Sequence, residues 1–245
     1  MNDQLSFENI ETTIVTPDSP VVIRAANLVK SYYQDEQELR VLKGLDLEFR
    51  RGEFTAIIGP SGAGKSTLLH LLGLLDLPTT GQVIFEDTDA ATLNEGKLAL
   101  LRDQKIGFIF QFYHLLPEFT VLENVLMPFF IRESTLNLGD SFRVQAEEIL
   151  DKVNLRERSQ HFPSQLSGGE QQRVAIARAI IANPDVILAD EPTGNLDYKA
   201  SLEIMRLLQR IHEVEGKTVI MVTHNDEYAK KAQRVIKLKD GRTVS

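Results

Sequence analysis

The sequence contains no cysteine, and its five histidines include no pair at the spacing of metal ligands. A disulfide framework needs cysteine, and a structural zinc site needs cysteine or paired histidine, so both are excluded. The lack of thiols is compatible with the reducing conditions of a cytoplasm.

Long hydrophobic runs are also lacking. The longest, at residues 68–75, contains His70 and Gly73 and falls far short of the roughly 20 residues that a helix needs to span a bilayer. Residues 1–8 lack the basic and apolar regions of a signal peptide. We therefore expect that any membrane association of this chain depends on a partner.

An excess of positive charge is absent as well, since 27 Lys and Arg are outnumbered by 35 Asp and Glu, for a formal net charge of -8. Proteins that coat nucleic acid neutralise its phosphates with basic residues, so no nucleic-acid partner is expected. The 245 residues, of which 42% are hydrophobic, are enough for one α/β domain with a small inserted subdomain.

The order of predicted elements indicates how the chain is organised. Residues 1–20 are polar and show no sustained periodicity, which predicts a flexible extension before a domain over 21–245. The runs Val21–Val29 and Val41–Phe49 predict an antiparallel β layer. Further strands are expected at 54–58, 82–85, 105–110, 186–189, 218–222 and 235–238, and helices at 65–72, 121–130, 141–153, 170–182, 199–213 and 226–232. Their alternation predicts a mostly parallel sheet covered on both faces, with a helical subdomain inserted at about 112–168.

A phosphate-binding loop is the first motif that carries chemistry. The pattern G-x-x-x-x-G-K-[ST] is satisfied by Gly59, Pro60, Ser61, Gly62, Ala63, Gly64, Lys65 and Ser66, followed by Thr67. Its glycines let backbone N–H groups converge on one anion, and the N-terminus of the following helix adds positive charge. Lys65 is expected at the terminal phosphates and the Ser66 hydroxyl at Mg²⁺. The alternative, a Gly-rich turn with a chance lysine, does not explain the strand and helix that flank the loop.

Two adjacent carboxylates, Asp190 and Glu191, end another apolar run. Ligands collect at the carboxyl ends of strands in open α/β sheets. Because successive strand residues point to opposite sides, Asp190 can face the magnesium held by Ser66 while Glu191 faces the attacking water. The alternative is an acidic strand exit before Pro192.

Two further strands end in polar residues that are expected at the same edge. His224 follows 218–222 and is predicted to contact the terminal phosphate and to orient Glu191 or the water. Gln111 follows 105–110 and is predicted to contact Mg²⁺ and the phosphate while its backbone moves the helical insertion. Taken alone, each is an ordinary polar loop residue.

A second anion-binding helix start is predicted at Ser167, Gly168 and Gly169, within the run Leu166–Arg173. The two phosphate-binding helix starts of one chain are not expected to bind the same ATP. Two such helix starts can meet at one ATP only if they belong to two copies of the chain. The sequence therefore predicts a head-to-tail homodimer with two ATP molecules between each phosphate loop and the opposing Ser167–Gly169 segment.

Together, the phosphate loop, Gln111, Leu166–Arg173, the run 186–191, Thr193–Asp197 and His224 resemble the ordered motif set of ATP-binding cassette (ABC) ATPases. The resemblance covers about residues 21–245 and implies an α/β P-loop NTPase fold, with a RecA-like, mostly parallel sheet core, an antiparallel β-subdomain and an inserted helical subdomain.

The same resemblance implies further roles. Tyr32 would stack on adenine, although the adjacent Tyr33 is an alternative, and Asp197 would lie at the dimer interface near the partner's phosphate loop. It also implies ATP and Mg²⁺ as cofactors, and integral membrane permease subunits as partners. The cargo would not touch this domain.

A narrower resemblance lies in Gln111–Val125, which is similar to the same segment of ATP-binding subunits of bacterial lipoprotein-releasing systems. It implies ATP hydrolysis at the cytoplasmic face of the inner membrane that powers lipoprotein release toward the outer membrane. ATPases of macrolide or peptide export and of cell division are alternatives, and a soluble ABC ATPase acting on nucleic acid or ribosomes is another. A phosphate-loop kinase does not explain Leu166–Arg173.

The segment Phe112–Phe119 is unusually apolar for a surface loop. We expect its apolar residues to line a groove that receives a short cytoplasmic helix of the permease. These residues are Phe112, Tyr113, Leu115, Leu116 and Phe119.

Overall fold

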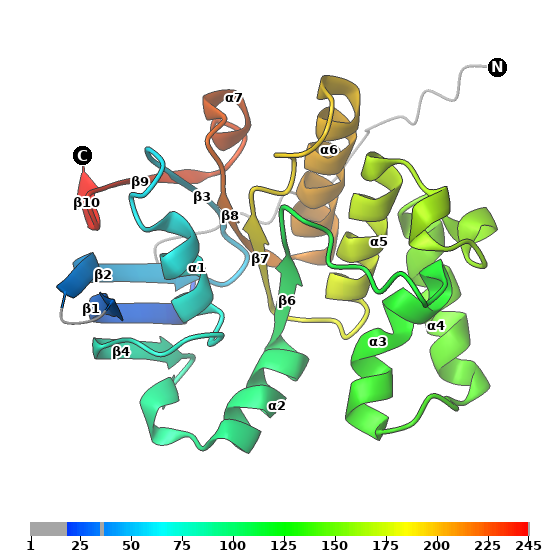
Figure 1. Cartoon of the computed structure of the whole chain (residues 1–245), viewed down its shortest axis with the longest axis horizontal. Helices are drawn as coiled ribbons and strands as arrows, with labels where there is room; N and C mark the ends of the chain where they lie inside the picture. Colours follow the sequence, from blue (N-terminus) through cyan, green and yellow to red (C-terminus); the bar gives the residue numbers. More distant parts are fainter. Residues whose placement is uncertain (1–18, 35–36, 245) are drawn as a thin grey trace.

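The computed structural model describes residues 19–34 and 37–244 (Figure 1). The predicted extension at 1–20 therefore lies almost entirely outside the described residues. Among the described helices, none is long and apolar enough to cross a membrane.

Strands that lie before and after the phosphate loop in the sequence form an antiparallel sheet. Its strands are β1 (Val21–Gln34), β2 (Gln37–Arg50), β4 (Thr80–Phe85) and β5 (Thr88–Asp89), in the order β2-β1-β4-β5. Alternate residues on one face are buried, and Leu28 pairs with Leu45. The predicted antiparallel layer is confirmed. Strands β1 and β2 are longer than predicted. The prediction was too short because the residues at their paired ends lack the hydrophobic alternation that marks the inner half of each strand.

The second sheet is mostly parallel, as predicted. It contains β3 (Phe54–Ile58), β6 (Ile106–Ile109), β7 (Val186–Asp190), β8 (Thr218–Val222), β9 (Arg234–Lys239) and β10 (Arg242–Val244), in the order β10-β9-β3-β8-β7-β6. Only the β9–β10 pair is antiparallel. The central strands are nearly continuous apolar runs because both of their faces are buried.

Two hydrophobic cores lie on the two faces of this parallel sheet. In β7, Ile187 and Ala189 belong to one core, and Val186 and Leu188 belong to the other. The period of two along a strand therefore divides each strand between the cores.

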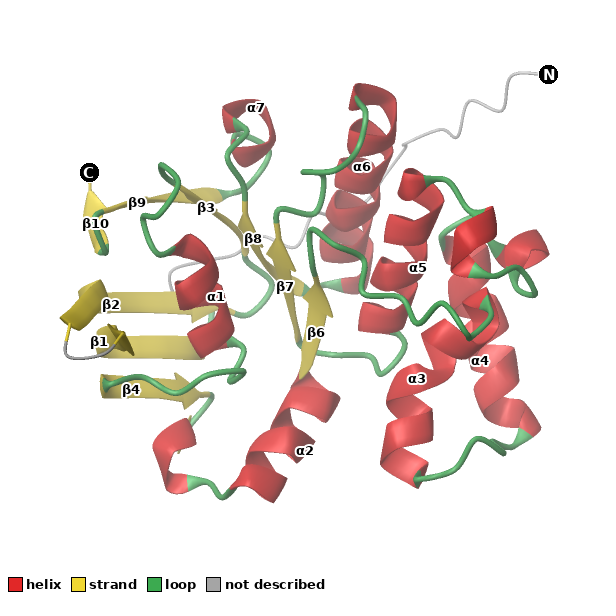
Figure 2. Ribbon diagram, in the orientation of Figure 1, coloured by secondary structure: helices red, strands yellow, loops and turns green. Residues whose placement is uncertain are grey.

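The helices are α1 (Lys65–Leu72), α2 (Glu95–Lys105), α3 (Val121–Glu133), α4 (Asp140–Lys152), α5 (Gly168–Ile180), α6 (Tyr198–Glu215) and α7 (Asp226–Ala229), with 3₁₀ turns at Ala90–Thr92, Arg156–Arg158 and Pro163–Gln165. Helix α1 packs in the core shared with the antiparallel sheet, and α3–α6 pack in the other core. Figures 1 and 2 show α3 and α4 beside α5, at the opposite end of the molecule from the antiparallel sheet. The exact bounds of a helical subdomain stay a prediction.

Within the described residues, one α-helix and two strands were not expected from the sequence. Helix α2 buries only Leu98, so its apolar periodicity is weak. Strands β5 and β10 have two and three residues, too few to show a pattern.

Candidate nucleotide-binding site

The loop Gly59–Gly64 connects β3 to α1, and its shape depends on glycine at particular positions. Gly62 has a φ of 77°, and a Cβ there would meet nothing within 4 Å, so its backbone conformation alone favours glycine. At Gly64, by contrast, a Cβ would lie 2.7 Å from Leu42 Cδ2 of the antiparallel sheet. The loop thus combines a left-handed turn with close packing against β2.

Lys65 is the first residue of α1, and its side chain folds back over the loop. Its Nζ donates hydrogen bonds to the carbonyl oxygens of Gly59 and Pro60, at 2.9 and 3.0 Å. No side chain caps the N-terminus of α1, so no cap occupies the first N–H groups of the helix. The Lys65 ammonium lies at the same loop. This arrangement suits an anion.

Ser66 and Asp190 are brought together by the sheet. Strand β7 ends at Asp190, and the Ser66 hydroxyl donates to Asp190 Oδ1 at 3.1 Å. Hydroxyl and carboxylate oxygens are ligands that bind Mg²⁺ in proteins, so these two residues fit the predicted metal.

Gln111 pairs with Asn195 in the loop that follows Glu191. Its Nε2 donates to Asn195 Oδ1 at 3.2 Å, while Asn195 Nδ2 donates to the Gln111 carbonyl at 3.0 Å. Gly194 permits this pairing, since a Cβ there would lie 2.9 Å from Gln111 Nε2. The structure therefore joins Gln111 to the loop after Glu191, and a direct link to Ser66 or Asp190 stays a prediction.

Glu191 and His224 form a contact pair just beyond β7 and β8. Glu191 has a φ of 48°, which is uncommon for a non-glycine residue and turns its side chain out of the strand direction. His224 Nδ1 lies 2.8 Å from Glu191 Oε2, and the His224 backbone N–H donates to the same oxygen at 3.3 Å. The His224 side chain is 69% exposed and the Glu191 side chain only 14%. The imidazole can therefore reach a bound ligand and Glu191 at once.

Ser167, Gly168 and Gly169 begin α5 with a capping box. The Ser167 hydroxyl accepts from the Glu170 backbone N–H, and Glu170 accepts from the Ser167 N–H and hydroxyl, both at 2.8 Å. These hydrogen bonds from Ser167 hold the pKa of the Glu170 carboxyl below its usual range. Ser167 is exposed, Gly168 is partly buried and Gly169 is buried.

Asp197 caps α6 in the same way, accepting from the Ala200 backbone N–H at 2.8 Å. It is exposed. Within 19–34 and 37–244, no hydrogen bond or ion pair joins Asp197 or Ser167–Gly169 to the phosphate loop.

Tyr32 and Tyr33 differ in their surroundings. Lys30 Nζ lies 5.0 Å from the centre of the Tyr32 ring, and the Tyr32 hydroxyl donates to Asp76 Oδ2 at 3.3 Å. Lys30 and Asp76 are themselves paired at 2.7 Å. The Tyr32 ring is thus held in place while 41% exposed, whereas Tyr33 is 69% exposed.

Gln172, which lies within the run Leu166–Arg173 but was given no role of its own in the sequence analysis, connects these parts. Gln172, fully buried on α5, donates to the carbonyl oxygens of Phe110 and Pro192, at 3.3 and 2.8 Å. It therefore ties α5 to the residues beside Gln111 and Glu191. The available signal was a glutamine on the buried face of a predicted helix, where an apolar residue is normal.

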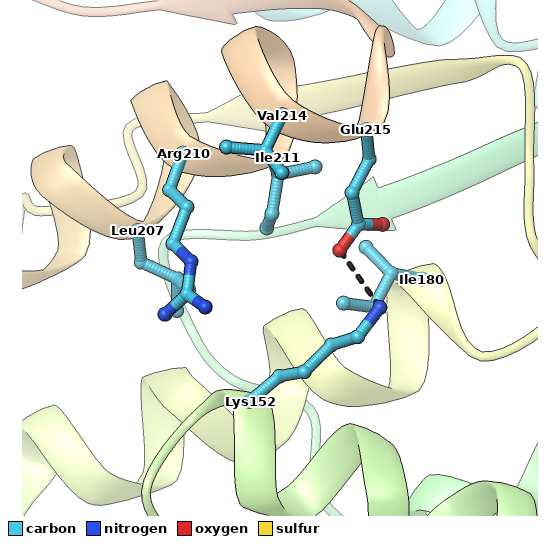
Figure 3. A pocket seen from close by; sticks show the side chains of 7 residues that line it. All are labelled: Lys152, Ile180, Leu207, Arg210, Ile211, Val214 and Glu215. Atoms are coloured by element: carbon cyan, nitrogen blue, oxygen red, sulfur yellow. Dashed lines mark hydrogen bonds and ion pairs between the residues drawn. The ribbon is translucent and has the colours of Figure 1, made fainter. Parts of the chain in front are cut away.

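A separate cavity of about 140 Å³ lies between α4, α5 and α6 (Figure 3). Its floor is apolar, and Lys152 at its rim pairs with Glu215 at 2.9 Å. None of the predicted site residues lines this cavity, so it lies outside the candidate nucleotide site.

Sequence comparison identifies relatives of this chain. The family model described as ABC transporter matches residues 42–194. The chain is 48% identical over 224 residues to the lipoprotein-releasing system ATP-binding protein LolD of Geobacter metallireducens, covering 91% of this chain and 98% of that protein. It is 48% identical over 212 residues to the macrolide export ATP-binding/permease protein MacB of Bdellovibrio bacteriovorus, covering 86% of this chain and 32% of that protein.

Solved structures of ABC transporter cassettes are similar to this chain as well. The dimeric structure of MJ0796, a bacterial ABC transporter cassette, superimposes with a TM-score of 0.84 at 44% identity, covering 91% of this chain and 97% of that one. The same cassette in a post-hydrolysis state, bound to ADP and Pi, gives a TM-score of 0.83 at 43% identity.

The fold and the phosphate loop define a P-loop ATPase, which confirms the predicted fold class and ATP as a ligand. More particularly, the chain belongs to the ABC transporter family.

The alternatives Tyr32 and Tyr33 can be separated by alanine substitution. We expect Tyr32→Ala to weaken MgADP binding by about 5- to 150-fold, because base stacking on an aromatic ring contributes ~1–3 kcal/mol. Isothermal titration calorimetry measures the loss, and Tyr33→Ala is the matched control, expected to bind as wild type does. A larger loss for Tyr33→Ala would reverse the assignment.

Proposed function

We propose that this chain is the ATP-hydrolysing subunit of a bacterial ABC transporter that releases lipoproteins from the inner membrane. The supporting observation is the similarity to the LolD protein of Geobacter metallireducens, which extends over 98% of that protein. The second candidate, macrolide export, is supported by an equal identity that covers only 32% of the MacB protein. The full-length match favours lipoprotein release.

The chemistry assigned to each residue follows from its position. Lys65 and the loop N–H groups bind the phosphates of ATP. Ser66 and Asp190 would hold Mg²⁺, and the bound cation would neutralise charge on the phosphates. Glu191 accepts a proton from the attacking water as the general base, and His224 holds the Glu191 carboxylate and contacts the terminal phosphate.

A complete site needs two chains. Ser167, Gly168 and Gly169 of one chain bind the ATP that occupies the phosphate loop of the other, and Asp197 lies at the same interface. The exposed Ser167 at the N-terminus of α5 supports this arrangement, because a helix N-terminus favours an anion. The dimeric ABC cassette with 44% identity supports it as well.

The membrane partner docks, in this proposal, on the segment Phe112–Phe119. Phe112 is 66% exposed and Leu116 is 37% exposed, and such neighbouring apolar side chains favour a protein contact. Leu115, which is one of the five predicted groove residues, is partly buried and packs against the hydrophobic core. Phe112 and Leu116 therefore form the centre of the docking surface. The chain binds the cytoplasmic face of the membrane peripherally through the permease.

Glu191→Gln is expected to bind ATP and to accumulate as an ATP-bound dimer with little turnover. Loss of a general base typically costs about 10²–10⁴-fold in rate, while Asp190 and Ser66 still hold the metal. Phosphate release and analytical ultracentrifugation measure the two effects. Turnover within a factor of two of wild type would contradict the role of Glu191.

The proposed transport function is tested by reconstitution. The chain is co-expressed with the permease subunits of a lipoprotein-releasing system, and ATP-dependent release of a lipoprotein from proteoliposomes is measured. Phe112→Glu combined with Leu116→Glu should abolish co-purification with the permease and lipoprotein release, because carboxylates at an apolar interface are costly to bury. ATP hydrolysis by the chain alone should persist.

The matched control for this pair is Ile131→Glu, which changes an apolar residue that is 71% exposed on α3. It should co-purify at wild-type yield. Normal co-purification of the Phe112/Leu116 double variant would place docking elsewhere, and macrolide transport without lipoprotein release would favour the second candidate.

A further inference from the structure

Arg178, on α5, holds the backbone of the docking segment. Its Nη1 donates to the His114 carbonyl at 2.6 Å and its Nη2 to the Tyr113 carbonyl at 2.8 Å. Among the described residues, no carboxylate lies within ion-pairing distance of this guanidinium. Burial lowers the pKa of Arg178. A partly buried charge whose acceptors are two carbonyls would be costly to leave unpaired, so the two-pronged contact holds the segment in place.

A second attachment lies at the other end of the docking segment. Asn124, fully buried on α3, accepts from the Leu116 backbone N–H at 2.8 Å. Its Nδ2 donates to the carbonyl oxygens of Leu116 and Phe119, both at 3.0 Å. The exposed side chains of Phe112 and Leu116 therefore lie on backbone held by two helices.

Tyr113 reaches from this segment to the start of α5. A Cβ at Gly168 would lie 2.9 Å from the Tyr113 hydroxyl oxygen, so a larger residue at this position would displace the tyrosine side chain. Ten residues of helix separate Gly168 from Arg178, a rise of about 15 Å. Arg178 holds the backbone of Tyr113, and the side chain of the same tyrosine lies against the first residue of α5. The docking segment is thus attached near both ends of one helix.

We propose that Arg178 is a positioning residue, which keeps Tyr113 against Gly168 and thereby sets the start of α5 for the ATP of the partner chain. This inference depends on the proposed two-chain site. It gives the contacts by which a force on Phe112 and Leu116 reaches the helix start that binds the partner's nucleotide.

The test uses Arg178→Met and Tyr113→Phe, each in the Glu191→Gln background, where ATP-bound dimers accumulate. Methionine keeps an unbranched stem without donors, and phenylalanine removes only the hydroxyl. We expect the ATP-dependent dimer to dissociate at least about tenfold more readily with Arg178→Met, since hydrogen bonds from a charged donor contribute ~1.5–3 kcal/mol. MgADP affinity of the monomer should stay within twofold of the background.

The separation between nucleotide affinity and dimer affinity distinguishes positioning from a general effect on folding. Because both residues act through one contact, the combined variant should weaken the dimer no more than Arg178→Met alone. Arg143→Met is the control, since Arg143 is exposed on α4 and, within the described part of the chain, pairs only with Glu147 of its own helix.

Three results would overturn the inference. The first is a dimer affinity of Arg178→Met within twofold of the background. The second is an equal loss of MgADP affinity, which would show a disturbed fold. The third is failure of Glu191→Gln alone to dimerise with ATP, which would also overturn the two-chain site and so identifies failure of the proposed function itself.

Discussion

The alignment of parallel strands at one sheet edge is the constraint on which the site depends. Ile57 pairs with Val222, and Val222 pairs with Asp190, so β3, β7 and β8 end level with one another. The phosphate loop, the carboxylate pair at the end of β7 and His224 after β8 must then lie together, although more than 150 residues separate the first from the last. A shift in this register would separate the Ser66 hydroxyl from the Asp190 carboxylate.

Helix α5 connects this sheet edge to the docking segment Phe112–Phe119 and to the outward-facing Ser167. Gln172 ties the helix to the residues beside Gln111 and Glu191, and Arg178 ties it to the docking segment. The N-terminus of the same helix carries Ser167, which faces outward. In the proposed two-chain site, α5 is therefore connected to the nucleotide site of its own chain, to the membrane partner and to the nucleotide of the second chain.

The sequence predicts local features well and long-range contacts poorly. The strand Phe54–Ile58 and the helix Lys65–Leu72 were predicted to the residue, because an apolar run, a glycine-rich turn and a helix follow one another without interruption. The contacts of Arg178 and Asn124 were not predicted, since both residues bind main-chain carbonyls that any sequence would supply. Helix α2 was missed because it buries a single leucine.

The central claim, that two chains complete each ATP site, can be tested by cross-linking because the chain has no cysteine of its own. Ser61→Cys is placed in one tagged copy and Ser167→Cys in a second, both with Glu191→Gln, and the two are mixed with a short bismaleimide. The account predicts a covalent heterodimer that appears only with ATP. Cross-linking independent of ATP, or its complete absence while both copies bind ATP, would contradict the account.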